Sequence, residues 1–82
     1  MEVASVIGEY IQRELLRRSD VRLGADTRVL GDGLLDSLQT VELVLFLERE
    51  FGVQVDPEEV TEENFATLRA IAGLVERKLR EG

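Results

Sequence analysis

The tripeptide Asp36-Ser37-Leu38 places a serine hydroxyl where a loop is expected to become a helix. Asp36 can act as the N-cap and Gln39 stands three residues later, so the pattern predicts a capping box with Ser37 at the first helical position. Unpaired amide donors and the positive end of the helix dipole stabilise an anion bonded there. The pattern therefore favours an exposed Ser37 that carries a covalently attached, phosphate-type group.

Ser37 has two other interpretations, as a catalytic nucleophile or as a helix residue without any function. A nucleophile needs a base and an oxyanion site. The sequence contains no histidine, and Asp36 is the only nearby candidate for the base. In addition, 82 residues leave room for one small domain and for no cleft between domains. We therefore expect the chain not to be an enzyme, and we expect another enzyme to modify Ser37.

The helix that must position this serine is predicted from Ser37 to Phe51, with Gly52 as the left-handed residue that ends it. Helical spacing gives this helix two stripes. The expected core face consists of Thr40, Leu43, Val44, Leu47 and Phe51. The second stripe consists of Leu38, Val41, Glu42, Leu45 and Glu48. Apolar residues at helical spacing usually belong to the core, but two separate stripes on one helix favour a contact surface.

Three further helices are predicted around it. Apolar residues at four-residue intervals indicate an amphipathic first helix over residues 2–18. Asp56-Pro57, followed by Glu59, is typical of the start of a short third helix. Residues 65–80 form the closing helix, with Thr67 as a plausible N-cap. Residues 19–35 are expected to be a long, ordered connection pinned by apolar anchors. The predicted fold is an all-α four-helix bundle, with residues 1–82 as one domain.

Charge is distributed unevenly along the chain. Residues 36–63 contain nine acids and one base, Arg49, whereas the remaining residues carry a net charge of +1. A negative field beside Ser37 should attract basic protein surfaces and repel nucleic acids and anionic membranes. A merely solubilising face is the alternative interpretation of this charge.

Composition limits the remaining chemistry. Cysteine and histidine are both absent, which removes disulfides and soft-metal sites, so no metal site is expected. The first residues lack a basic region leading into a long apolar run, and no apolar stretch approaches the roughly 18 residues that span a bilayer. These features favour a cytoplasmic protein. A calcium module built from Asp20, Asp26, Asp32 and Asp36 is a weak alternative, because their spacing fails the EF-hand pattern.

The run DSLQTVELVLFLEREFGVQV resembles the second-helix region of acyl carrier proteins and the related peptidyl carrier domains. The resemblance spans nearly the whole chain. The tripeptide alone is a weak motif. It becomes specific together with Gly33 and Leu35 before it, the run Thr40-Val41-Glu42-Leu43 after it, and the end of the helix at Phe51.

This resemblance implies that Ser37 bears 4'-phosphopantetheine, added from coenzyme A by a phosphopantetheinyl transferase. The thiol of this arm would carry an acyl or aminoacyl thioester from an activating enzyme to synthase, condensing or tailoring enzymes. Partner recognition would fall on the second stripe, Leu38, Val41, Glu42, Leu45 and Glu48, and the carrier would act as a monomer. Arg49 departs from fatty-acid carriers, where that place is commonly acidic.

The cargo is less defined than the arm. The closing segment resembles stand-alone carriers, including D-alanine carriers, and a discrete carrier of polyketide or nonribosomal peptide biosynthesis is the preferred interpretation. A fatty-acid carrier and a D-alanine carrier are the alternatives within the family. From another class of protein, an unmodified acidic helical adaptor for basic partners also fits the sequence.

Overall fold

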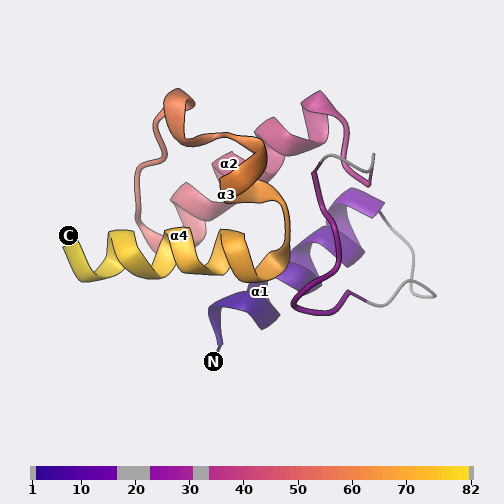
Figure 1. The fold of residues 1–82 in the computed structure, drawn as a ribbon, viewed down its shortest axis with the longest axis horizontal. Helices are drawn as coiled ribbons and strands as arrows, with labels where there is room; N and C mark the ends of the chain where they lie inside the picture. Colours follow the sequence, from indigo (N-terminus) through magenta and orange to yellow (C-terminus); the bar gives the residue numbers. More distant parts are fainter. Residues whose placement is uncertain (1, 17–22, 31–33, 82) are drawn as a thin grey trace.

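The computed structural model of the chain describes residues 2–16, 23–30 and 34–81 (Figure 1). Every regular element in these ranges is helical, which confirms the all-α prediction. In chain order the elements are α1 (Val3–Tyr10), a π-helical segment (Ile11–Leu16), α2 (Ser37–Phe51), a 3-10 turn (Pro57–Glu59), α3 (Glu62–Phe65) and α4 (Leu68–Glu81).

The first helix is amphipathic, as predicted, but it changes its winding. It runs as α1 and continues without a break into the π-helical segment. Ile7, Ile11 and Leu15 lie on its buried side. The four-residue spacing of these side chains places them on one face, and the α1 part of the helix packs against α4. Its predicted final residues, Arg17 and Arg18, lie outside the described residues.

Helix α2 begins and ends where the sequence predicts. Asp36 is its N-cap, and Gly52 ends it in the left-handed conformation at φ 68°. Leu43 and Leu47 on its inner face are fully buried. Thr40 is also buried, and its hydroxyl donates to the carbonyl of Asp36 at 2.8 Å, so the polar atom on the core face has a partner.

The predicted short third helix is divided into two pieces. Asp56 and Glu59 form the expected capping box, but only the 3-10 turn follows it. At Val60 the backbone leaves the helical region, with φ −83° and ψ 76°. Thr61 then caps α3 by accepting from the Asn64 amide at 3.1 Å. A second N-cap so close to the first explains why the segment restarts instead of continuing as one helix.

Helix α4 supplies the centre of the core. It starts at Leu68 rather than Phe65, because Thr67 accepts a hydrogen bond from the Ala70 amide at 3.1 Å and acts as the predicted N-cap. Ile71 and Val75 are fully buried, and Phe65 packs beside them. Leu79, predicted as part of this apolar face, is 46% exposed in the last turns of the helix.

The described part of the connection between the first two helices is hydrogen-bonded to the end of α3 and to α4, which agrees with the predicted order of this segment. The Val29 amide donates to the carbonyl of Ala66 at 2.7 Å, and the Arg69 amide donates to Ala25 at 2.9 Å. Arg69 also pairs with Asp26 through its side chain at 3.0 Å. Val29 is buried, so both polar and apolar contacts hold the loop.

Candidate functional site

The start of α2 has the capping geometry that the sequence predicts. The Asp36 carboxylate accepts from the Gln39 amide at 2.8 Å, and the Gln39 side-chain oxygen accepts from the Asp36 amide at 3.1 Å. Ser37 is the first residue of the helix and is exposed. The two reciprocal hydrogen bonds fix the backbone around Ser37 while its hydroxyl stays accessible.

A second contact holds this helix terminus against the rest of the molecule. The side-chain nitrogen of Gln39 donates to the carbonyl of Leu15 at 3.0 Å, at the end of the π-helical segment. Leu35, just before the cap, is buried, and its amide donates to Val29 at 3.3 Å. The serine therefore projects from a terminus that is anchored from two sides.

The residues at this terminus fit a phosphodiester on Ser37. The amides of the first helical turn and the dipole of a 15-residue helix favour negative charge there. The Asp36 carboxylate is engaged by the Gln39 amide and leaves the serine side chain free on the surface. This geometry suits a group attached by an outside enzyme, because a bulky transferase can reach the hydroxyl.

The second stripe of α2 lies on the surface next to Ser37. Leu38 is 69% exposed, and Val41 and Leu45 are each 55% exposed. Glu42 is exposed as well. An exposed apolar stripe on a helix whose inner face holds buried Thr40, Leu43 and Leu47 is the kind of surface that the predicted partner contact requires. The structure brings Ser37, Leu38, Val41, Glu42 and Leu45 together on one side of α2.

Glu48 has a structural contact that the sequence does not indicate. Its carboxylate accepts a hydrogen bond from the Val55 amide at 3.0 Å, and the side chain is partly buried. Glu48, which was predicted as a partner contact, therefore also has a structural role within the protein. It holds the extended segment after Gly52 against α2.

That segment forms one wall of an apolar groove beside the stripe. The groove has a volume of about 320 Å³. Its lining consists of Thr40, Val41, Val44 and Leu45 from α2 and of Val55, Pro57 and Val60 from the opposite wall. Sequence reasoning missed this groove, and the only signal for its second wall was the short extended run Val53-Gln54-Val55.

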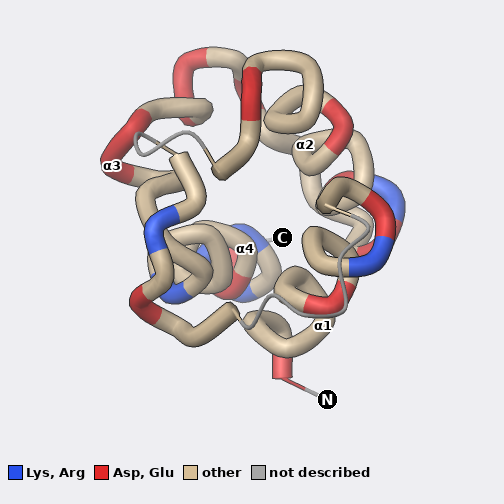
Figure 2. Tube along the Cα trace, turned by 90° about the vertical axis from the view of Figure 1, so that its right-hand side faces the viewer, with Lys and Arg blue, Asp and Glu red and all other residues tan. Residues whose placement is uncertain are grey.

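The division of charge is incomplete. Figure 2 shows Asp and Glu along the α2 and α3 side of the molecule, while Lys and Arg lie beside α4 and also on the right of the view, between α1 and α2. Lys78 of α4 crosses this division and pairs with Glu59 at 2.7 Å. The Lys78 hydrogen bond, with the Asp56 amide, holds the pKa of the Glu59 carboxyl below its ordinary value.

The calcium alternative gains no support. Asp26 is paired with Arg69 and Asp36 caps α2, while Asp20 and Asp32 lie outside the described residues. The described ranges hold no group of three or more acidic side chains placed to bind a metal ion. Within the same ranges, no helix combines the length and the apolar character that a membrane crossing requires.

Most of the chain matches a known protein family. A family model described as "Phosphopantetheine attachment site" matches residues 6–75. The chain is 33% identical over 79 residues to "Acyl carrier protein, chloroplastic" of Brassica napus, and the match covers 96% of this chain and 57% of that protein. It is 32% identical over 78 residues to "D-alanyl carrier protein" of Abiotrophia defectiva, with 95% of this chain and 92% of that protein covered.

The fold has a match among solved structures. A chain in a crystal structure described as "FAD-dependent dehydrogenase" superposes with a TM-score of 0.77 and 29% identity, covering 84% of this chain and 97% of that one. The present chain spans little more than half of the chloroplastic relatives but nearly all of the D-alanyl carrier. The chain therefore belongs to the phosphopantetheine-attachment family of acyl and D-alanyl carrier proteins, whose prosthetic group is a covalently attached 4'-phosphopantetheine.

Proposed function

We propose that the hydroxyl of Ser37 is the attachment point of the 4'-phosphopantetheine arm and that residues 1–82 act as one carrier domain. The observation that carries this proposal is an exposed serine at the first position of a capped and anchored helix. A transferase would join the phosphopantetheinyl group of coenzyme A to the Ser37 oxygen, with release of the hydroxyl proton and of adenosine 3',5'-bisphosphate. The terminal thiol of the arm supplies the thioester bond that holds the cargo.

The cargo proposed here is an acyl or aminoacyl group in polyketide or nonribosomal peptide biosynthesis. The acyl carrier relatives point to a fatty-acid carrier as one alternative, and the D-alanyl carrier relatives point to a D-alanine carrier as another. The match to the D-alanyl carrier of Abiotrophia defectiva covers 92% of that protein. The carrier itself is not the catalyst in any of these functions.

The partners proposed are a phosphopantetheinyl transferase, an activating enzyme and the synthase, condensing or tailoring enzymes of the pathway. Their contact surface would be the exposed stripe of Leu38, Val41, Glu42 and Leu45, which adjoins Ser37. We propose that the carrier is a cytoplasmic monomer. An oxidising flavoenzyme belongs among the candidate partners, because the matched solved structure bears the name of an FAD-dependent dehydrogenase.

The attachment is tested by incubating the purified protein with coenzyme A, Mg²⁺ and a broad-specificity transferase and recording the intact mass. We expect the mass to rise by one phosphopantetheinyl group, and Ser37→Ala should abolish the rise. Ser5→Ala is the matched control, because Ser5 is also an exposed serine in the first turn of a helix but lacks the Asp-Ser-Leu motif. An unchanged mass of the wild-type protein would refute the proposal.

The cargo is tested on the modified protein. Candidate activating enzymes are supplied with ATP and with fatty acids, amino acids or D-alanine, and the thioester is detected as a second mass increase that hydroxylamine removes. Loading by an amino-acid-activating enzyme alone would favour the nonribosomal context. Loading with D-alanine alone would instead identify a D-alanine carrier. Loading by a fatty-acid enzyme alone would identify a fatty-acid carrier.

The unmodified adaptor is the competing function from another class, and it is favoured by the acidic surface. It requires that Ser37→Ala leave pathway function intact, whereas Glu42→Lys abolishes it. The carrier function requires the opposite result for Ser37→Ala. Glu42 is a cleaner position for this comparison than Glu48, because Glu48 also holds the Val55 amide.

A further inference from the structure

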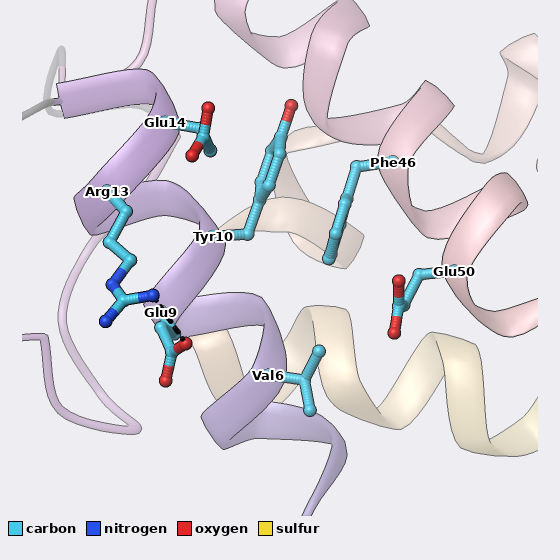
Figure 3. A pocket seen from close by; sticks show the side chains of 7 residues that line it. All are labelled: Val6, Glu9, Tyr10, Arg13, Glu14, Phe46 and Glu50. Atoms are coloured by element: carbon cyan, nitrogen blue, oxygen red, sulfur yellow. Dashed lines mark ion pairs between the residues drawn. The ribbon is translucent and has the colours of Figure 1, made fainter.

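A cavity between α1 and α2, whose lining shares no residue with the exposed stripe, is not used by the proposed function. It has a volume of about 310 Å³. Its apolar floor is made of Val6, Tyr10 and Phe46. The rings of Tyr10 and Phe46 stack at a centroid distance of 3.8 Å and an angle of 10°, and they bridge the two helices (Figure 3).

Carboxylates surround this aromatic floor from both helices. Glu9 and Glu14 come from the first helix, and Glu50 comes from α2 on the other side (Figure 3). Arg13 is the one base in the lining, and it pairs with Glu9 at 3.4 Å. Three acids and one base leave the cavity with a net charge of −2.

The electrostatic surroundings of Tyr10 agree with this charge. Burial is the main cause that raises the pKa of the Tyr10 phenol above its ordinary value of 10.0. The negative charge of Glu42 raises this pKa further, the positive charge of Arg49 opposes it, and Glu14 adds a smaller increase. The phenol is therefore neutral at physiological pH and belongs to the apolar floor, while the rim stays negative.

An apolar floor and a negative rim together restrict the occupant. An anion would be repelled, and a purely apolar group would cover carboxylates without replacing their hydration. A long basic side chain satisfies both parts, because its methylene stem can lie on the rings and its cationic head can reach the carboxylates. Exposed ion pairs are individually weak, so a free amine would gain little here. A basic side chain on a partner protein binds more strongly, because the other contacts of the interface add to the ion pair.

We propose that this cavity is a second docking site that receives an arginine or lysine side chain of an enzyme that modifies or loads the carrier. Phe46 lies nine residues after Ser37, about 13.5 Å along the helix and half a turn around it. An enzyme whose basic side chain binds in the cavity thus leaves the stripe of Leu38, Val41 and Leu45 accessible. The choice of enzyme rests on the proposed function, but the cavity and its charge do not.

The first test needs no modification of Ser37. ¹⁵N-labelled protein is titrated with N-acetylarginine amide and, as the neutral control, with N-acetylcitrulline amide, and the amide shifts are followed by NMR. We expect millimolar binding of the arginine probe, with shifts concentrated at Tyr10, Glu14, Phe46 and Glu50. Equal shifts with citrulline, or shifts spread over the acidic surface, would overturn the proposal. Micromolar binding of the free probe would also overturn it, since a soluble amine would then be the occupant.

The second test measures enzyme kinetics with the double variant Glu14→Gln, Glu50→Gln. Both positions are exposed and the replacements keep the side-chain shape, so the fold should be unchanged. We expect KM for the carrier to rise about three- to ten-fold for the transferase or the activating enzyme, with kcat unchanged. The variant Glu76→Gln, Glu81→Gln removes the same charge from exposed positions of α4 and should leave KM within about two-fold of wild type.

The outcomes of the two proposals are separable. Failure of Ser37 modification appears as an unchanged intact mass, whereas failure of the docking site appears as an unchanged KM at normal modification. If the α4 control raises KM as much as the cavity variant does, the effect is one of net charge and the docking site is disproved. An unchanged KM for both enzymes would likewise disprove it.

Discussion

At the scale of single residues, neighbouring positions of α2 have different tasks. Ser37 and Glu42 are exposed. Glu48, on the same helix, accepts from the Val55 amide at 3.0 Å and thereby fixes the wall of the apolar groove. Its carboxylate was predicted from the sequence only as part of a recognition stripe. The backbone amide that it binds is seven residues away and could not be identified from helical periodicity.

The role of Glu48 leads to a prediction about local stability. Glu48→Ala removes a hydrogen-bond acceptor from a partly buried amide, which should cost about 1 kcal/mol and speed hydrogen exchange at Val55 about five-fold. Glu48→Gln keeps an acceptor oxygen and should restore most of the protection. Exchange is measured by NMR, with Glu42→Ala as the exposed control. Equal exchange at Val55 in all four proteins would show that the hydrogen bond does not hold the wall.

At the scale of elements, the ends of the helices were predictable because capping depends on local sequence. The Asp36 and Gln39 box, the Thr67 cap and the left-handed Gly52 are all found where the residues indicate them. The third helix was predicted less well, since Thr61 starts a new turn after Val60 has left the helical conformation. Asp56 and Thr61 are both good N-caps and lie within six residues of each other. From the sequence alone it is therefore hard to tell one continuous helix from two short ones.

Replacing two glycines by alanine should change the stability of the protein in opposite directions. Gly52 has φ 68° and no atom near the position of an added Cβ, so Gly52→Ala introduces backbone strain alone and should destabilise the protein by about 1 kcal/mol. Gly73 lies inside α4, and an added Cβ would meet only an ordinary contact of 3.6 Å with the flexible Arg77 side chain. Gly73→Ala should therefore stabilise the protein by roughly 0.5–1 kcal/mol.

Urea unfolding of the two variants checks this pair. The midpoints should move in opposite directions while the m-values stay equal to that of the wild type. Gly52→Asn should lose less stability than Gly52→Ala, because asparagine tolerates the left-handed conformation better. A stabilising effect of Gly52→Ala would contradict the assignment of Gly52 as the left-handed end of α2.

At the scale of the whole molecule, long-range contacts on α4 hold the separate segments together. Asp26 pairs with Arg69 to fix the loop, and Glu59 pairs with Lys78 to fix the segment beside the groove. The Cα radius of gyration of 11.6 Å is close to the value of about 12 Å expected for a compact domain of this length. These pairs add polar contacts outside the buried core.

Both pairs predict the same sign of pH dependence. The hydrogen bond from Arg69 lowers the pKa of Asp26 below its ordinary 3.8, and the hydrogen bond from Lys78 lowers the pKa of Glu59 below its ordinary 4.5. The unfolded chain therefore binds more protons than the folded protein in this acidic range. The stabilisation is fully present above the ordinary pKa values and is lost as the pH falls through the folded values.

Thermal unfolding across this pH range measures the effect. The variant Asp26→Asn, Glu59→Gln should have a lower Tm than the wild type at neutral pH, and the difference should shrink toward zero at strongly acidic pH. The Asp26 carboxyl is exposed and the Glu59 carboxyl is partly exposed, so we expect a small change in Tm. A Tm difference that stays constant over the whole range would show that these carboxyls do not contribute through ionisation.

The sequence by itself determined the all-α class, the bounds of α2 and the capped position of Ser37. Each of these depends on residues within one or two helical turns, where spacing and capping chemistry decide the conformation. Tertiary structure alone decided which distant residues meet: Tyr10 with Phe46 across the helix gap, Glu48 with the Val55 amide, and the two walls of the apolar groove. Such contacts depend on how the helices pack, and helical periodicity describes the faces of a helix without naming their partners.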